Sequence, residues 1–133
     1  MDYLYSLILY FFTYQMTILE NIKEIKERIC YQYNDSNRLS IREPNLIAVS
    51  KFHGEDKIIQ AIQAGQQDFG ENRLQEIQTK WSNIKAKYPH IRLHFIGAIQ
   101  SNKILEIAEL CDVIHSISSI KMLEILCNKA TSD

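Results

Sequence analysis

The sequence predicts an α/β fold in which parallel strands alternate with helices in one domain. Strand candidates are marked by Leu46, Asp68, Leu93 and Val113, at intervals of 22, 25 and 20 residues. The segments between them carry apolar residues at helical spacing. A length of 133 residues allows one domain at most. Strands and helices that alternate at this pace are typical of right-handed βα units that build a parallel sheet.

A helix is expected before the first strand, beginning just after Met16. Thr17 and Glu20 have the spacing of a capping box, in which each residue's side chain caps the other residue's backbone N–H. Four isoleucines then recur at spacings of four, three and four, which places them on one helical face. They are Ile18, Ile22, Ile25 and Ile29.

The first two βα units follow Pro44, which excludes helix just before the next apolar run. Residues 46–49 form a short continuous apolar run, which predicts a strand buried on both faces. Helical spacing follows at residues 58–62, and Gly65 suits the position just past a helix end. Residues 68–70 predict the second strand, and the apolar residues from Leu74 to Ile84 mark the helix that Pro89 ends.

The last two units have the same organisation. Residues 91–96 predict a strand, 102–110 a helix and 112–115 a strand. A final helix begins near Ser118 or Ser119, either of which could cap it. Its expected apolar positions are Ile120, Leu123 and Leu126. This pattern fits either an open doubly wound sheet or part of a (β/α)₈ barrel, and periodicity does not choose between them.

The first fifteen residues differ in composition from the rest of the chain. Residues 3–14 contain six of the thirteen aromatic residues and no Lys or Arg. Twelve residues are fewer than the roughly 20 that span a bilayer. The segment also lacks the basic start and cleavage site of a signal peptide. We therefore expect residues 1–15 to be a hydrophobic extension outside the fold and residues 16–133 to form the domain.

Charge and cysteine content narrow the function classes. Lys plus Arg is 15 and Asp plus Glu is 16, which gives a net charge of −1. This balance argues against a nucleic-acid or anionic-membrane partner. The three cysteines, Cys30, Cys111 and Cys127, form no CxxC pair, so neither a disulfide scaffold nor a zinc finger is expected. Free thiols suit a reducing compartment, and we expect a cytoplasmic protein.

Familiar catalytic and nucleotide-binding motifs are absent from the sequence. It contains no GxGxxG, no GxxxxGK[ST] and no GxSxG. The four histidines show no HxxxH or HExxH spacing, so no metal site is predicted. His94 lies on the alternating strand with Arg92 and Ile96 on its face, where a histidine is more often structural than catalytic.

Polar residues collect where the predicted strands end, and ligands of parallel α/β folds bind at that edge. Lys51 follows the first apolar run, at residues 46–49. The aliphatic part of its side chain is therefore expected to start in a region shielded from water. Desolvation lowers the pKa of a lysine and yields the free amine that condenses with carbonyls. The alternative is an ordinary lysine at a strand end whose ammonium group reaches water. The position of Lys51 in the sequence, taken alone, favours this alternative. Gly70-Glu71-Asn72 alone is best interpreted as a strand-to-helix turn.

Four motifs occur in one order on consecutive units: Ala48-Val49-Ser50-Lys51, Phe69-Gly70-Glu71-Asn72, His94-Phe95-Ile96-Gly97 with Gln100-Ser101-Asn102-Lys103, and Ile114-His115-Ser116. Together they resemble the pyridoxal 5′-phosphate homeostasis protein family (YggS/PROSC type). That family is similar to the N-terminal barrel domain of alanine racemase. The resemblance begins near Met16 and runs to the end of the chain.

The resemblance implies the N-terminal half of a (β/α)₈ TIM-type barrel, about four βα units preceded by a helix. It implies pyridoxal 5′-phosphate (PLP) as cofactor, held as a Schiff base, the internal aldimine, on Lys51. Asn72, His94 and Ser116 match motif positions around the pocket mouth. Family members are described as PLP carriers or regulators in PLP homeostasis, so no catalytic residue is predicted.

Two departures from the family pattern shape the functional hypotheses. Phe52 and His53 follow Lys51, where the family often has a second lysine. A full barrel takes about 250 residues, and the family's phosphate-binding motifs lie in the second half. We therefore expect a truncated, impaired PLP-binding protein. The alternatives are a PLP-dependent racemase or decarboxylase, or a non-functional fragment or interaction module that pairs with a separately encoded C-terminal half.

Overall fold

The computed structural model describes residues 16–35 and 44–130 and has the predicted α/β fold. Its four strands are β1 (Ala48–Val49), β2 (Asp68–Glu71), β3 (Arg92–Phe95) and β4 (Val113–Ile114). All neighbouring strands pair in parallel, in the order β1-β2-β3-β4. The expectation that residues 3–14 lie outside the sheet concerns residues outside the described part of the chain.

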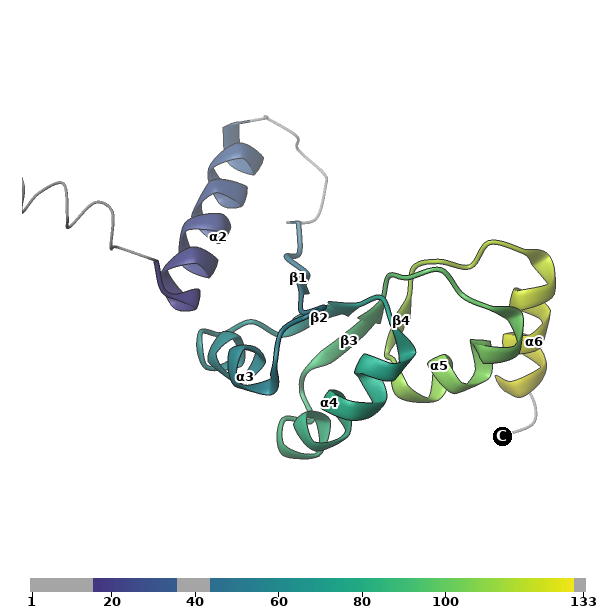
Figure 1. Cartoon of the computed structure of the whole chain (residues 1–133). Helices are drawn as coiled ribbons and strands as arrows, with labels where there is room; N and C mark the ends of the chain where they lie inside the picture. The colour runs from purple at the N-terminus through teal and green to yellow at the C-terminus, as the bar shows by residue number, and fades with distance from the viewer. Residues whose placement is uncertain (1–15, 36–43, 131–133) are drawn as a thin grey trace, which may run out of the picture.

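The helices are α2 (Ile18–Asp35), α3 (Glu55–Gln63), α4 (Leu74–Lys87), α5 (Ile104–Leu110) and α6 (Ile120–Ala130), with a short 3₁₀ turn, η1 (Ser101–Lys103), before α5. Helices α3, α4 and α5 follow one another along one side of the sheet (Figure 1). Helix α2 packs against α3, and α6 packs against α5. The helix–strand alternation predicted from the sequence is confirmed.

Three predicted helix ends are confirmed in detail. Thr17 Oγ1 accepts a hydrogen bond from the Glu20 N–H at 3.2 Å, and Glu20 Oε2 accepts one from the Thr17 N–H at 2.8 Å. These two bonds form the expected capping box at the start of α2. Gly65 follows α3 with a φ of +81°, the left-handed conformation that favours glycine after a helix. Ser119 Oγ accepts from the Met122 N–H at 3.3 Å and caps α6.

The hydrophobic core lies between the sheet and helices α3, α4 and α5. Phe69 on β2, Leu93 and Phe95 on β3, and Trp81 on α4 are all at most 2% exposed. The rings of Phe69 and Trp81 lie 5.3 Å apart at a tilted angle. Because alternate strand residues face opposite sides, this core takes only one face of the sheet.

The prediction that the first strand is buried on both faces is wrong. Strand β1 comprises Ala48–Val49 alone, and Val49 is 46% exposed. Ala48 packs on the core, whereas Val49 points to the opposite face of the sheet. Ile96, on the same opposite face, is 37% exposed. No helix among the described residues covers this face, which explains the exposure of both residues.

Two helical faces differ from expectation for a similar reason. On α2, Ile22 is buried but Ile25 is 44% exposed, because the contact with α3 covers only part of the isoleucine face. On α6, Met122 is the buried residue, while Ile120 and Leu123 are largely exposed. Helix α6 packs against α5 on one side only, so its apolar face is wider than the surface that covers it.

Candidate functional site

The carboxyl ends of the four strands lie at one edge of the sheet, because the strands are parallel and in register. Val49 pairs with Gly70, Gly70 with His94, and Phe95 with Ile114. Lys51 therefore follows β1 at the same edge where Asn72 follows β2 and Ser116 follows β4. The fold brings these three predicted site residues to one edge, while His94 lies inside β3.

Lys51 lies on a tight turn immediately after β1. The His53 N–H donates to the Ser50 carbonyl at 3.1 Å and closes the turn around Lys51 and Phe52. Lys51 is exposed, so the dry surroundings expected from its position after an apolar run are absent. The reason is that β1 ends two residues earlier, at Val49, on an uncovered sheet face.

The turn carries local backbone strain at the residue after Lys51. Phe52 has a φ of +64°, in the left-handed region that costs an ordinary residue about 1–2 kcal/mol. Its ring lies between two cations, 5.9 Å from Lys51 Nζ and 5.2 Å from Arg73 Cζ. Such a conformation persists only where surrounding contacts impose it.

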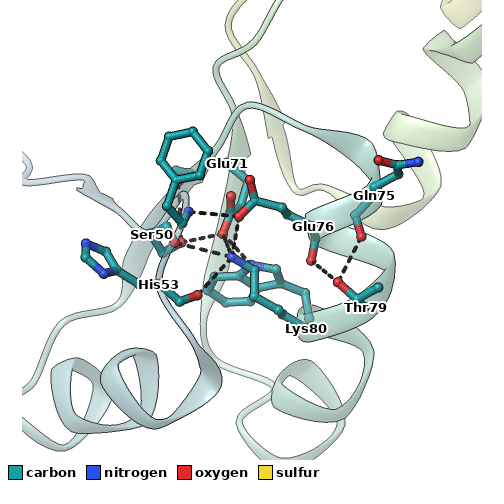
Figure 2. A network of polar contacts seen from close by, with 10 residues as sticks. Ser50, His53, Glu71, Gln75, Glu76, Thr79 and Lys80 are labelled. Atoms are coloured by element: carbon teal, nitrogen blue, oxygen red, sulfur yellow. Dashed lines mark hydrogen bonds and ion pairs between the residues drawn. The ribbon is translucent and has the colours of Figure 1, made fainter.

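Those contacts come from a buried polar cluster, made of Ser50, Glu71, Glu76 and Lys80 and shown in Figure 2. The Lys80 ammonium lies 2.9 Å from Glu71 Oε1 and 2.8 Å from Glu76 Oε2. It also donates to the Ser50 carbonyl at 3.3 Å and to the His53 carbonyl at 3.2 Å. The cation thus bridges helix α4, strand β2 and the turn that carries Lys51.

Glu71 is the fully buried member of this cluster. Its Oε1 accepts from Ser50 Oγ at 2.8 Å and from Trp81 Nε1 at 3.2 Å, in addition to Lys80. Glu71 is the last residue of β2 and has its side chain on the core side. The interpretation of Gly70-Glu71-Asn72 as a strand-to-helix turn is therefore wrong for Gly70 and Glu71, whereas Asn72 does lie in the connection to α4. The strand is one residue longer than predicted. Ser50, Trp81 and Lys80 all contact Oε1 of this carboxylate, while its buried Oε2 has no hydrogen-bond partner among the described residues.

The ionisation of the cluster follows from these contacts. Burial disfavours the Lys80 ammonium, but the hydrogen bonds and negative charges of Glu76 and Glu71 outweigh it, so the pKa of Lys80 is raised. The hydrogen bond from Lys80, aided by the N–H of Phe52, lowers the pKa of Glu76. Lys80 is therefore a firmly protonated cation, in contrast to the free amine that carbonyl condensation requires.

Asn72 and Ser116 both meet the backbone of Gly97, which follows β3. A Cβ atom at residue 97 would overlap the Asn72 carbonyl oxygen, so only glycine fits there. Ser116 Oγ donates to the Gly97 carbonyl. The Asn72 side-chain Oδ1 is buried and has no hydrogen-bond partner among the described residues. Gly97 thus holds the ends of β2, β3 and β4 together.

His94 has both ring nitrogens engaged on the face of the sheet opposite the core. Nε2 lies 2.8 Å from Asp68 Oδ1, and Nδ1 lies 2.9 Å from His115 Nε2. Arg92 Nη2 also lies 2.7 Å from Asp68 Oδ1, and Asn45 donates to Asp68 Oδ2 at 2.7 Å. Burial opposes ionisation of Asp68, but these hydrogen bonds and the Arg92 charge together lower its pKa. The observed contacts of His94 are with protein groups.

Sequence reasoning missed Glu71 and Lys80 as members of the site. The sequence does hold a partial signal, because Glu76 and Lys80 have the i,i+4 spacing of a helical ion pair. No pattern in the sequence shows that Lys80 reaches two carbonyls of the turn after β1, since that contact is tertiary.

Among residues 16–35 and 44–130, no group of three or more His, Cys, Asp or Glu side chains could hold a metal ion. Over the same residues, none of the helices has the length and apolar character needed to cross a membrane.

The fold and the site define a class of protein: a parallel α/β sheet with a lysine on the turn after its first strand. No protein-family model matches the chain. It is 45% identical to the pyridoxal phosphate homeostasis protein of Buchnera aphidicola (subspecies Schizaphis graminum) over 82% of this chain and 46% of that protein. It is 38% identical to the protein of the same name from Vibrio alginolyticus, over 88% of this chain and 51% of that one.

The chain is also similar to a protein of known structure. PipY of Synechococcus elongatus, determined without PLP, is 36% identical and superposes with a TM-score of 0.64 over 78% of this chain and 48% of PipY. PipY has also been solved with PLP bound. The chain belongs to the pyridoxal phosphate homeostasis protein family. It spans about half the length of the curated relatives it matches.

Proposed function

We propose that this chain binds PLP in PLP homeostasis, with the cofactor held as a Schiff base on Lys51. The observation that carries the proposal is the position of Lys51, exposed on a constrained turn at the carboxyl end of β1. Its relative PipY, which superposes on this sheet, has a structure with PLP bound. Lys51 adds its amine nitrogen to the aldehyde carbon, and water leaves as the C=N bond forms.

The residues at this edge fit one end of PLP well. The exposed amine of Lys51 suits the aldehyde, and the unpartnered Oδ1 of Asn72 offers an acceptor. Ser116 is half-buried at the same edge. His94 lies behind them, and we propose that it shapes the floor of the site through Asp68 and His115. PLP would supply an electron sink for carbanions when bound. We propose a carrier, because both ring nitrogens of His94, a described site residue that could act as an acid or base, contact other protein groups.

The phosphate end of PLP fits less well. A phosphate dianion is retained by backbone N–H groups and cations, often in a glycine-rich loop at a helix start. Gly70 and Gly97, the glycines nearest the strand ends, are both packed against neighbouring atoms. We therefore propose that tight retention of the phosphate needs groups beyond these residues.

We further propose that the domain is the N-terminal half of a (β/α)₈ barrel. Strands β1 and β4 each have one partner in the four-stranded sheet, whereas a closed barrel has no edge strand. Val49 and Ile96 are exposed on the face that would line a barrel interior. A pocket beside β1 is lined in part by Ile22, Val49 and Ile58, where a neighbouring strand would pack. A separately encoded C-terminal half is the partner we propose.

Titration with PLP tests the proposed function. Formation of the Schiff base on the wild-type chain shifts the PLP absorption spectrum, and Lys51→Ala removes the shift. Lys57→Ala is the matched control, because Lys57 is exposed on the neighbouring helix α3 and takes no part in the turn. The proposal is wrong if Lys51→Ala and Lys57→Ala give the same spectrum as the wild-type chain.

A further inference from the structure

Helix α4 holds three backbone groups of the Lys51 turn. The Ser50 N–H instead bonds to the Gly70 carbonyl, and the His53 N–H closes the turn. Lys80 donates to the Ser50 and His53 carbonyls, which flank Lys51 and Phe52. Glu76 Oε2 accepts the Phe52 N–H at 2.9 Å. Three backbone groups of a four-residue turn are therefore tied to two side chains one helical turn apart.

Helix α4 is a rigid support for these two side chains. Its residues Ile77, Trp81 and Ile84 are buried in the core against the sheet. Glu71 fixes the Lys80 ammonium from the opposite side and also holds the Ser50 hydroxyl and the Trp81 indole. In Figure 2 the Lys80 side chain rises between the turn residues and the two carboxylates.

The turn needs such support because its own sequence does not favour its conformation. Phe52 occupies a positive φ, which only glycine adopts without strain. The side chain of Lys51 lies over the Phe52 ring, so the direction of its stem follows the conformation of this turn.

We propose that Lys80 and Glu76 are positioning residues for Lys51: they impose the strained turn and so fix where its amine meets an aldehyde. This inference rests on the proposed function and adds residues that act through Lys51 without touching PLP. Loss of either residue lets the turn relax, so that Lys51 samples many directions while the fold remains.

Four variants test the proposal on the full 133-residue chain. Glu76→Ala removes the acceptor of the Phe52 N–H but leaves the Lys80–Glu71 pair in place, so no fully buried charge loses its partner. Glu76→Gln restores an acceptor at the same position. Lys85→Met is the matched control. Lys85 lies on the same helix as Glu76 and Lys80, but it pairs with Asp112 and does not touch the turn. Lys80→Met is the more severe fourth variant.

Two readouts separate positioning from stability. The first is amide hydrogen exchange of Phe52, measured without PLP. We expect it about tenfold faster in Glu76→Ala, since a hydrogen bond to a charged group contributes at least that factor. The second is the yield of borohydride-trapped PLP at Lys51 relative to that at Lys57. This ratio falls in Glu76→Ala, recovers in Glu76→Gln and is unchanged in Lys85→Met.

Each outcome decides a different claim. A folded Glu76→Ala chain with wild-type Phe52 exchange and a wild-type Lys51-to-Lys57 ratio overturns the positioning role. If Lys80→Met does not fold, Glu76→Ala still decides it. If wild-type chain gives no adduct at Lys51, the proposed function fails, and Phe52 exchange alone then shows whether α4 imposes the turn.

Discussion

The backbone of Gly97 lies directly against the backbone of Asn72. A Cβ at residue 97 would overlap the Asn72 carbonyl oxygen and come within 2.8 Å of the Asn72 Cα. This contact joins the end of β3 to the end of β2, and the hydrogen bond from Ser116 to the Gly97 carbonyl adds the end of β4. One glycine thus sets the spacing of the edge on which the candidate site is built.

Gly97→Ala is therefore expected to destabilise the fold. The clash is with backbone, which cannot rotate away, and overpacking of this kind costs about 1–3 kcal/mol. Gly54→Ala is the control, because a Cβ there meets the flexible Asp56 side chain instead. Urea unfolding measures both. Equal stability of the two variants would contradict the close approach.

Asp68 is expected to make stability depend on acid pH. Its pKa in the folded protein lies below the ordinary 3.8, so it contributes stability above the unfolded-state pKa. That contribution is lost as pH falls through the lowered folded pKa. Asp68→Asn should be less stable than wild type at neutral pH, and the difference should shrink as the pH falls below about 3.8. Urea unfolding at a series of pH values measures this. A constant difference would show that the Asp68 charge does not matter.

The three cysteines should differ in reactivity. Burial raises the pKa of the Cys111 thiol to about 11 from the ordinary 9.0, and the thiolate is the form that alkylates. Cys30 and Cys127 are exposed. Iodoacetamide should modify these two in the native chain and Cys111 only in urea. Stability should also fall as pH rises from 9.0 toward 11, because the unfolded thiol ionises first. Rapid native labelling of Cys111 would place it outside the core.

The chain alone should retain PLP weakly and self-associate. Within the described part of the chain, β1 and β4 are edge strands and the sheet face with Val49 and Ile96 is uncovered, which favours association. The glycines at these strand ends, Gly70 and Gly97, are packed and form no loop for a phosphate. Dialysis and sedimentation measure both properties. Co-expression with a chain that carries four more βα units should restore solubility and PLP retention together. A monomer that keeps PLP through extensive dialysis would show that the four-stranded domain is sufficient.

Much of the fold could be predicted because its signals are local. The capping box at Thr17 and Glu20, the helix end at Gly65 and the alternation of strands with helices all follow from spacing along the chain. The errors concern which apolar residues are buried, because burial depends on the elements that pack on them in the tertiary structure. Val49 and Leu123 are apolar residues in correctly located elements, and they are exposed because no described element packs on them.

The candidate site also has a part that the sequence predicts and a part that depends on tertiary contacts. Lys51, Asn72 and Ser116 could be placed at one edge because parallel strands carry their carboxyl ends together. The contact of Lys80 with the turn after β1 joins residues about 30 positions apart, and nothing local to either segment predicts it. The backbone strain at Phe52 could not be predicted either, because nothing in the sequence around Phe52 indicates a positive φ.

Borohydride reduction of the chain with PLP, followed by peptide mapping, tests the central claim most directly. The account predicts one dominant phosphopyridoxyl adduct on Lys51, well above the labelling of the other nine lysines. It also predicts that Lys51→Ala loses this adduct without gaining an equal one elsewhere. Adducts spread evenly over the surface lysines, or the same total labelling in Lys51→Ala, would contradict a PLP site built on Lys51.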